Sequence, residues 1–212
     1  MTASLLTPAP ASPHPGGMPA VSRSFNHQYG VEQVRVLPGA YYTTGARDEM
    51  IVTILGSCVA ACVRNPRTGY GGMNHFMLPR SDSGDWSGLS SAMRYGNFAM
   101  EALINDVLKT GCPRADLEIK LFGGANLYNG PSMVGTQNLE FALGYLRTEG
   151  LPFKSQDLGG PRGRRIHYFP ATGAVKRLLL KPTTDLRLIR SEQNYVQSLQ
   201  QQPIEGDVDL FD

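Results

Sequence analysis

The chain has 212 residues, of which 41% are hydrophobic and 18% are charged, as expected of a globular protein with a substantial core. Its formal net charge of +2 is too small to indicate a nucleic-acid or membrane partner by itself. The three cysteines are an odd number, which argues against a disulfide framework and favours a reducing, cytoplasmic location. No apolar stretch reaches the roughly 18 residues of a membrane helix, and the N-terminal residues do not resemble a signal peptide.

Composition divides the chain into three segments. Residues 1–24 are rich in Pro, Ala and Gly and have no hydrophobic period, which predicts a flexible leader. Residues 186–212 are rich in Gln and end in an acidic stretch, which predicts a separate C-terminal tail. One domain is therefore expected over residues 25–185.

Hydrophobic periodicity predicts a mixed succession of strands and helices. Short apolar or β-branched runs predict strands at 31–37, 50–56, 70–78, 117–123, 152–158, 165–170 and 174–180. Residues 90–111 and 136–150 show the pattern of helices, each closed by a glycine, and residues 59–63 fit either a helix or a strand. This order predicts an α/β fold: a single-domain layered sandwich of mixed β-sheet with two long helices.

Cys58 is the first candidate for chemistry. It follows an apolar strand in the stretch LGSCV, where backbone N–H groups could stabilise a thiolate or form an oxyanion hole. A buried, inert thiol is the simpler interpretation, because free cysteines are among the most buried residues. A metal site is a third possibility, since Cys58, Cys62 and His75 could supply ligands, but no fourth Cys or His lies nearby and no metal is predicted.

His75 strengthens the catalytic interpretation of Cys58. It lies in GMNHFMLP, one predicted element further along the chain, and an imidazole beside a thiol supplies the base that acyl transfer needs. A third group should orient the ring, and Thr53, on the strand that leads to Cys58, is a candidate. Ser57 and Asn74 are candidates for contacting the substrate or its oxyanion.

Two glycine-rich loops carry weaker signals. FGGANLYNG (122–130) follows a strand but lacks the Lys and Ser/Thr of a phosphate-binding loop. GGPRGRR (159–165) places Arg162, Arg164 and Arg165 near a predicted hairpin tip, where they could meet an acidic partner helix or simply be solvated.

Several of these motifs together resemble the CheD family of bacterial chemotaxis proteins. The resemblance covers about residues 31–180, in order and without large gaps. The stretches that carry it are ILGSCVAACV, GGMNHFMLP, MRYGNFAMEALINDVLKTG, IKLFGGAN, LEFALGYLRTEGLP and DLGGPRGRRIHYFPATGAV.

The resemblance implies a chemoreceptor glutamine deamidase, which hydrolyses receptor glutamine side chains to glutamate through a cysteine thioester. It implies catalytic roles for Cys58, His75 and Thr53, and a fold similar to the deamidase toxins of the cytotoxic necrotising type. It also implies methyl-accepting chemotaxis receptors as substrates and a CheC-type phosphatase as a partner, with no cofactor.

Two other functions stay open from the sequence. One is a non-catalytic adaptor that binds CheC or receptors, in which Cys58 would react with alkylating reagents no faster than Cys62 and Cys112. The other is a different Cys–His acyl-transfer enzyme, such as a small protease or transglutaminase. Release of ammonia without chain cleavage or amine incorporation separates a deamidase from both enzymes.

Overall fold

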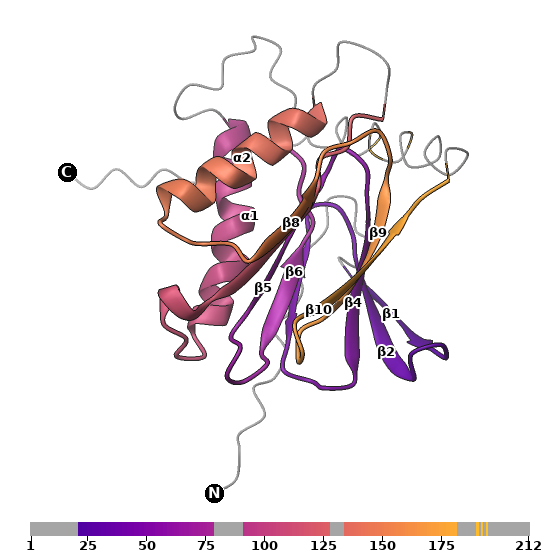
Figure 1. The fold of residues 1–212 in the computed structure, drawn as a ribbon, viewed down its shortest axis with the longest axis vertical. Coiled ribbons are helices and arrows are strands. Elements are labelled where there is room, and N and C mark those ends of the chain that lie inside the picture. The colour runs from indigo at the N-terminus through magenta and orange to yellow at the C-terminus, as the bar shows by residue number, and fades with distance from the viewer. Residues whose placement is uncertain are drawn as a thin grey trace, which may run out of the picture.

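The computed structural model describes residues 21–78, 91–127 and 134–181, together with 190, 192 and 194. Within them the chain forms two five-stranded sheets and two α-helices, and Figure 1 shows both helices on the same side of the molecule. The first sheet has the order β1 (Val21–Asn26), β2 (Val31–Val36), β4 (Glu49–Leu55), β9 (Arg164–Phe169) and β10 (Ala174–Leu179). The second has the order β3 (Tyr41–Thr44), β6 (Gly71–Asn74), β5 (Val59–Arg64), β7 (Glu118–Gly123) and β8 (Ser155–Leu158).

Both sheets are mixed. The pairs β2–β4 and β7–β8 are parallel, and the other paired strands are antiparallel. The helices α1 (Ser91–Leu108) and α2 (Val134–Thr148) pack on the second sheet, and a short 3-10 helix (Arg114–Asp116) precedes β7.

Strand β5 shows how the sequence builds three layers. Val59, Ala61 and Val63 join the core beneath the helices. Ala60 and Cys62, which alternate with them, join the core between the two sheets. Both faces of β5 are therefore covered, which explains its continuous apolar sequence and places the second sheet in the middle of the molecule.

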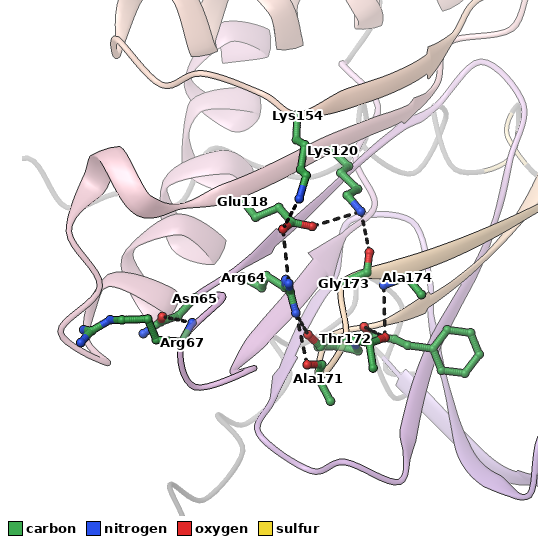
Figure 2. A network of polar contacts seen from close by, with 12 residues as sticks. Arg64, Asn65, Arg67, Glu118, Lys120, Lys154, Ala171, Thr172, Gly173 and Ala174 are labelled. Carbon is green, nitrogen blue, oxygen red and sulfur yellow. Dashed lines mark hydrogen bonds and ion pairs between the residues drawn. The ribbon is translucent and has the colours of Figure 1, made fainter.

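A polar network holds the two sheets together at one end (Figure 2). The Arg64 guanidinium, at the end of β5, donates to the carbonyls of Pro170 and Ala171 in the turn between β9 and β10, each at 3.2 Å. It also pairs with Glu118 at 3.3 Å, and Lys120 lies 3.1 Å from the same carboxylate. The turn belongs to the first sheet and Glu118 to the second, so this cluster fixes how they meet at the end of β5 remote from Cys58.

The predicted layered α/β fold is confirmed, and the expected strands and both helices are present with shifted ends. Residues 59–63 form a strand, β5, and two strands were not predicted, β1 and β3. Strand β1 begins at Val21, so a strand lies at the end of the segment that was expected to be a leader. The rest of that leader and most of the tail lie outside the described residues.

Candidate active site

Cys58 lies in a crossover between the two sheets. Strand β4 of the first sheet ends at Leu55 and strand β5 of the second begins at Val59, so residues 56–58 connect them. The link between β2 and β3 crosses between the sheets beside His75. Here the Gly39 N–H donates to the His75 carbonyl at 2.7 Å, and the His75 N–H donates to the Ala40 carbonyl at 2.9 Å.

The carbonyl groups of the 56–58 crossover are all held by hydrogen bonds. The Gly56 carbonyl accepts from the Ala125 N–H at 2.8 Å, and the Cys58 carbonyl accepts from the Gly124 N–H at 2.7 Å. Between them, the Ser57 carbonyl accepts from Nδ2 of Asn138 on α2, also at 2.8 Å. The GGAN loop, which resembled a weak phosphate cradle in the sequence, thus fixes the backbone around Cys58.

Two glycines are required by close contacts at this crossover. Gly123 has φ +113°, and a Cβ there would lie 2.1 Å from the Cys58 carbonyl oxygen. A Cβ at Gly56 would lie 2.6 Å from Cδ1 of Leu127 and 2.7 Å from a carboxylate oxygen of Glu192. Neither position admits a side chain without displacing backbone or a packed residue.

Thr53 and His75 are brought together from different sheets. Oγ1 of Thr53 lies 2.8 Å from Nδ1 of His75, and both residues are buried. The same hydroxyl donates its single hydrogen to the Val36 carbonyl at 2.8 Å, so it must accept from His75. This arrangement places the ring proton on Nδ1 and leaves Nε2 as the nitrogen that can take up a proton.

Cys58 and His75 face the same layer between the sheets. Their neighbours Val59 and Phe76 pair antiparallel, with reciprocal backbone hydrogen bonds of 3.0 and 2.9 Å. Val59 and Phe76 pack under the helices, so the alternation of the extended backbone turns Cys58 and His75 the other way, toward Thr53. In this register they are diagonal neighbours across the antiparallel pair.

The N–H groups of the crossover converge on a carboxylate. Glu192, from the C-terminal segment, accepts from the N–H groups of Gly56 at 3.0 Å, Ser57 at 3.1 Å and Cys58 at 3.4 Å. The Ser57 hydroxyl donates to it as well, at 2.6 Å. Glu192 itself is 7% exposed. We call the donors of residues 56–58 the carboxylate cradle.

The Cys58 thiol is enclosed in this structure. Burial raises its pKa well above the ordinary value, and the charge of Glu192 and a hydrogen bond to it raise the pKa further. Cys62 and Cys112 are also buried free thiols, with pKa values raised chiefly by burial. The cradle that was expected to favour a Cys58 thiolate is therefore occupied by another anion.

The other residues predicted to contact the substrate or a partner do not lie together: one is in the carboxylate cradle and the rest are elsewhere. Ser57 belongs to the carboxylate cradle, whereas Asn74 faces the helix layer, where its amide binds the Ala61 N–H and the Ala99 carbonyl. Arg162 and Arg164 donate to backbone carbonyls of their own domain: Arg162 to Leu180, and Arg164 to Asp157 and Gly159.

Arg164 is buried and Arg165 is exposed, so Arg165 is the member of the trio that presents its side chain to solvent. Two residues at the crossover had no part in the sequence-based site, Asn138 and Glu192. In the sequence, Asn138 is simply a polar residue of a predicted helix and Glu192 a polar residue of the Gln-rich tail, so neither pattern indicated a role at the site.

The possible metal ligands are not grouped in the described part of the chain. Among those residues, no three His, Cys, Asp or Glu side chains lie close enough together to hold a metal ion. The described helices also include none that is both long and apolar enough to cross a membrane.

Comparison with known proteins assigns the family. The model of the family described as "CheD chemotactic sensory transduction" matches residues 77–177. The "Probable chemoreceptor glutamine deamidase CheD" of Halorhodospira halophila is 48% identical over 92% of both chains. The protein of the same name from Rhodopseudomonas palustris is 46% identical over 91% of this chain and 90% of its own.

Among solved structures, Bacillus licheniformis hypothetical protein YfiH aligns with 56% of this chain and 51% of its own, at 12% identity and a TM-score of 0.38. That alignment is too loose to bear on the fold or the site. The sequence relatives, in contrast, match nearly from end to end, and with them the chain belongs to the CheD family.

Proposed function

We propose that this chain is a chemoreceptor glutamine deamidase, in which Cys58 is the nucleophile, His75 the acid–base group and Thr53 the residue that orients the imidazole. The observation that carries the proposal is the 2.8 Å contact between Thr53 and His75, made in the layer that Cys58 also faces. The names of the relatives supply the substrate class, glutamine side chains of chemoreceptors.

The first step forms a bond between sulfur and carbon. Nε2 of His75 takes the thiol proton, and Sγ of Cys58 attacks the amide carbon of a receptor glutamine. The C=O bond of the amide becomes a C–O⁻ bond, whose charge the N–H groups of the carboxylate cradle stabilise. A donor of this kind contributes about 3–4 kcal/mol to lowering such a barrier.

The second half releases ammonia and then glutamate. The imidazolium of His75 protonates the departing nitrogen as the C–N bond breaks, which leaves a thioester on Cys58. His75 then takes a proton from water, the resulting hydroxide attacks the thioester carbon, and the C–S bond breaks to give a glutamate side chain and the regenerated thiol. Thr53 accepts from Nδ1 throughout and so stabilises the ring in both protonation states.

Every atom in these reaction steps comes from the chain, the substrate or water, so the proposal names no cofactor. The protein would act in the cytoplasm, on the cytoplasmic helices of the receptors. A CheC-type phosphatase is proposed as a further partner on the resemblance described above, and co-purification of the two proteins tests it.

The experiment is mass spectrometry of receptor cytoplasmic fragments incubated with the protein, combined with an ammonia assay. Conversion of specific glutamines with one ammonia per site is expected, and Cys58→Ala should abolish it. Cys62→Ala, which removes a buried thiol facing the same layer, is the matched control and should retain activity. Conversion by Cys58→Ala would exclude the mechanism, and receptor binding without ammonia release would favour an adaptor.

A further inference from the structure

Glu192 reaches the crossover from far along the chain. Its hydrogen-bond partners at residues 56–58 are separated from it by 134 to 136 positions in sequence. Both carboxylate oxygens are engaged, Oε1 by Gly56 and Cys58 and Oε2 by Ser57. The contact is therefore a docked side chain rather than a local turn.

The cradle is built for an anion. Its donors are consecutive backbone N–H groups and one hydroxyl, the arrangement by which proteins bind carboxylates and phosphates through backbone dipoles. Its carbonyls are turned away and bound by Ala125, Asn138 and Gly124, so the N–H groups cannot rotate out of position. Gly56 leaves room for the carboxylate oxygens, because a Cβ there would lie 2.7 and 3.0 Å from them.

The occupant has the chemistry of the reaction product. Deamidation of a glutamine side chain yields a glutamate side chain, and the group in the cradle is a glutamate side chain. The backbone N–H of Cys58 donates to the same carboxylate at 3.4 Å, so the bound carboxyl group lies beside the residue that carries the reactive sulfur.

We propose that the carboxylate cradle is the binding site for the substrate and product side chain, and that Glu192 occupies it as an intramolecular product mimic that keeps the enzyme closed. This inference rests on the proposed deamidase function and adds regulation of the same site. A receptor glutamine must displace Glu192 to react, so the apparent affinity for the receptor is reduced by the fraction of molecules that are open. A tethered side chain competes at an effective concentration of about millimolar.

The first test measures access to Cys58. The full-length protein, Glu192→Ala and Glu140→Ala are treated with iodoacetamide at neutral pH, and labelling of each cysteine is followed by peptide mass spectrometry. Glu140 is an exposed acid on α2 and serves as the control for loss of charge. Glu192→Ala should label Cys58 at least about tenfold faster, because the carboxylate no longer lies beside the residue, with Cys62 and Cys112 unchanged.

Equal labelling of Cys58 in the three proteins would show that Glu192 does not block access to Cys58, and would overturn the proposal. Deamidation of a receptor fragment is measured in parallel, where Glu192→Ala should lower KM. Loss of deamidation in a folded Glu192→Ala protein would also overturn the proposal, because Glu192 would then assist the reaction rather than block it.

The second test asks whether the cradle holds a side chain in reach of the sulfur. In Glu192→Gln the introduced amide should be hydrolysed back to a carboxylate within the same molecule, and in Glu192→Gln combined with Cys58→Ala it should persist. Gln193, the next residue, is the internal control and should stay unchanged. If a receptor fragment is converted but position 192 is not, the cradle assignment is wrong and the deamidase function stands. If neither is converted, the proposed function fails.

Discussion

Oγ1 of Thr53 and Nδ1 of His75 lie 2.8 Å apart, although the residues are 22 positions apart and come from different sheets. The Thr53 hydroxyl is committed as a donor to the Val36 carbonyl, so it can only accept from the imidazole. A hydroxyl is a weaker partner than the carboxylate of a Ser-His-Asp triad, and it fixes the tautomer without adding a negative charge. The proposed roles of both residues follow from this single contact.

Thr53→Ala should lower kcat for deamidation by about tenfold to a hundredfold, because the imidazole loses the acceptor that orients it. KM should change little, since Thr53 is only 1% exposed and its hydroxyl bonds to His75 and the Val36 carbonyl. Thr53→Ser retains the hydroxyl and should recover most of the activity. Steady-state kinetics on a receptor fragment checks this, and equal rates for Thr53→Ala and the unmodified protein would contradict it.

Asn138→Ala should impair catalysis indirectly, through the backbone of the crossover that carries Cys58. The Asn138 side chain donates to the Ser57 carbonyl and accepts from the Leu78 N–H, so its loss frees the crossover to move. We expect kcat to fall by about tenfold to a hundredfold, as small misplacements of reacting groups do. Asn65→Ala is the control, because Asn65 is equally buried and bonds to Thr110 instead.

Both asparagine variants should lose about 1–3 kcal/mol of unfolding free energy from unsatisfied buried groups, as measured by urea denaturation. Only the crossover variant should lose kcat. A similar fall in kcat for both would show that the effect of Asn138 is general stability rather than positioning.

Gly123→Ala should destabilise the fold far more than a change at another glycine of positive φ. Its Cβ would lie 2.1 Å from the Cys58 carbonyl oxygen, in addition to the strain of φ +113°. Gly150 has φ +62° with no atom within 4 Å of an added Cβ, so Gly150→Ala should cost only the backbone strain of about 1–2 kcal/mol. Urea midpoints compare the two variants, and equal losses would contradict the close approach of Gly123 to the Cys58 carbonyl.

Stability should fall at alkaline pH. Burial raises the pKa values of Cys58, Cys62 and Tyr168, so these groups stay neutral in the folded chain at a pH where they ionise in the unfolded chain. The stability gained is complete below the unfolded pKa, about 8.5 for Cys and 10 for Tyr, and is lost as the pH rises above it.

Each such thiol should then lower the unfolding free energy by about 1.4 kcal/mol per pH unit. The measurement is the urea midpoint between about pH 8 and 10, where Cys62→Ala should show a shallower slope than the unmodified protein. An unchanged slope in that variant would mean that the folded-state pKa of Cys62 is ordinary.

The parts of the fold that the sequence could predict are those with a local period. Strands β4 and β7 are short apolar runs beside glycines, and α1 and α2 carry an apolar face ended by glycine. Strand β1 has the sequence VSRSFN with mostly exposed residues, so no alternation distinguished it from the leader. Strand β3 has four residues, too few to establish a period.

Cys58 and His75 could be predicted as site residues because each lies in a short stretch that also contains glycine, LGSCV and GMNHFMLP. Thr53 was a candidate because it lies on the strand that leads to Cys58, and its contact with His75 depends on how the sheets stack. Glu192 had no signal, because the contact joins positions 136 apart and a carboxylate in a polar tail is ordinary in sequence. Asn74 was expected near the substrate, but strand parity turns it toward α1.

A pocket lined by N–H donors discriminates between neutral and charged occupants. Hydrogen bonds to a carboxylate are about twice as strong as those to an uncharged amide, so the pocket formed by residues 56–58 holds the ionised acid better than the amide that enters it. The finished side chain should therefore leave this pocket more slowly than the unreacted amide does. On the proposal made above, Glu192 returns to the carboxylate cradle after each cycle and prevents the product side chain from binding again.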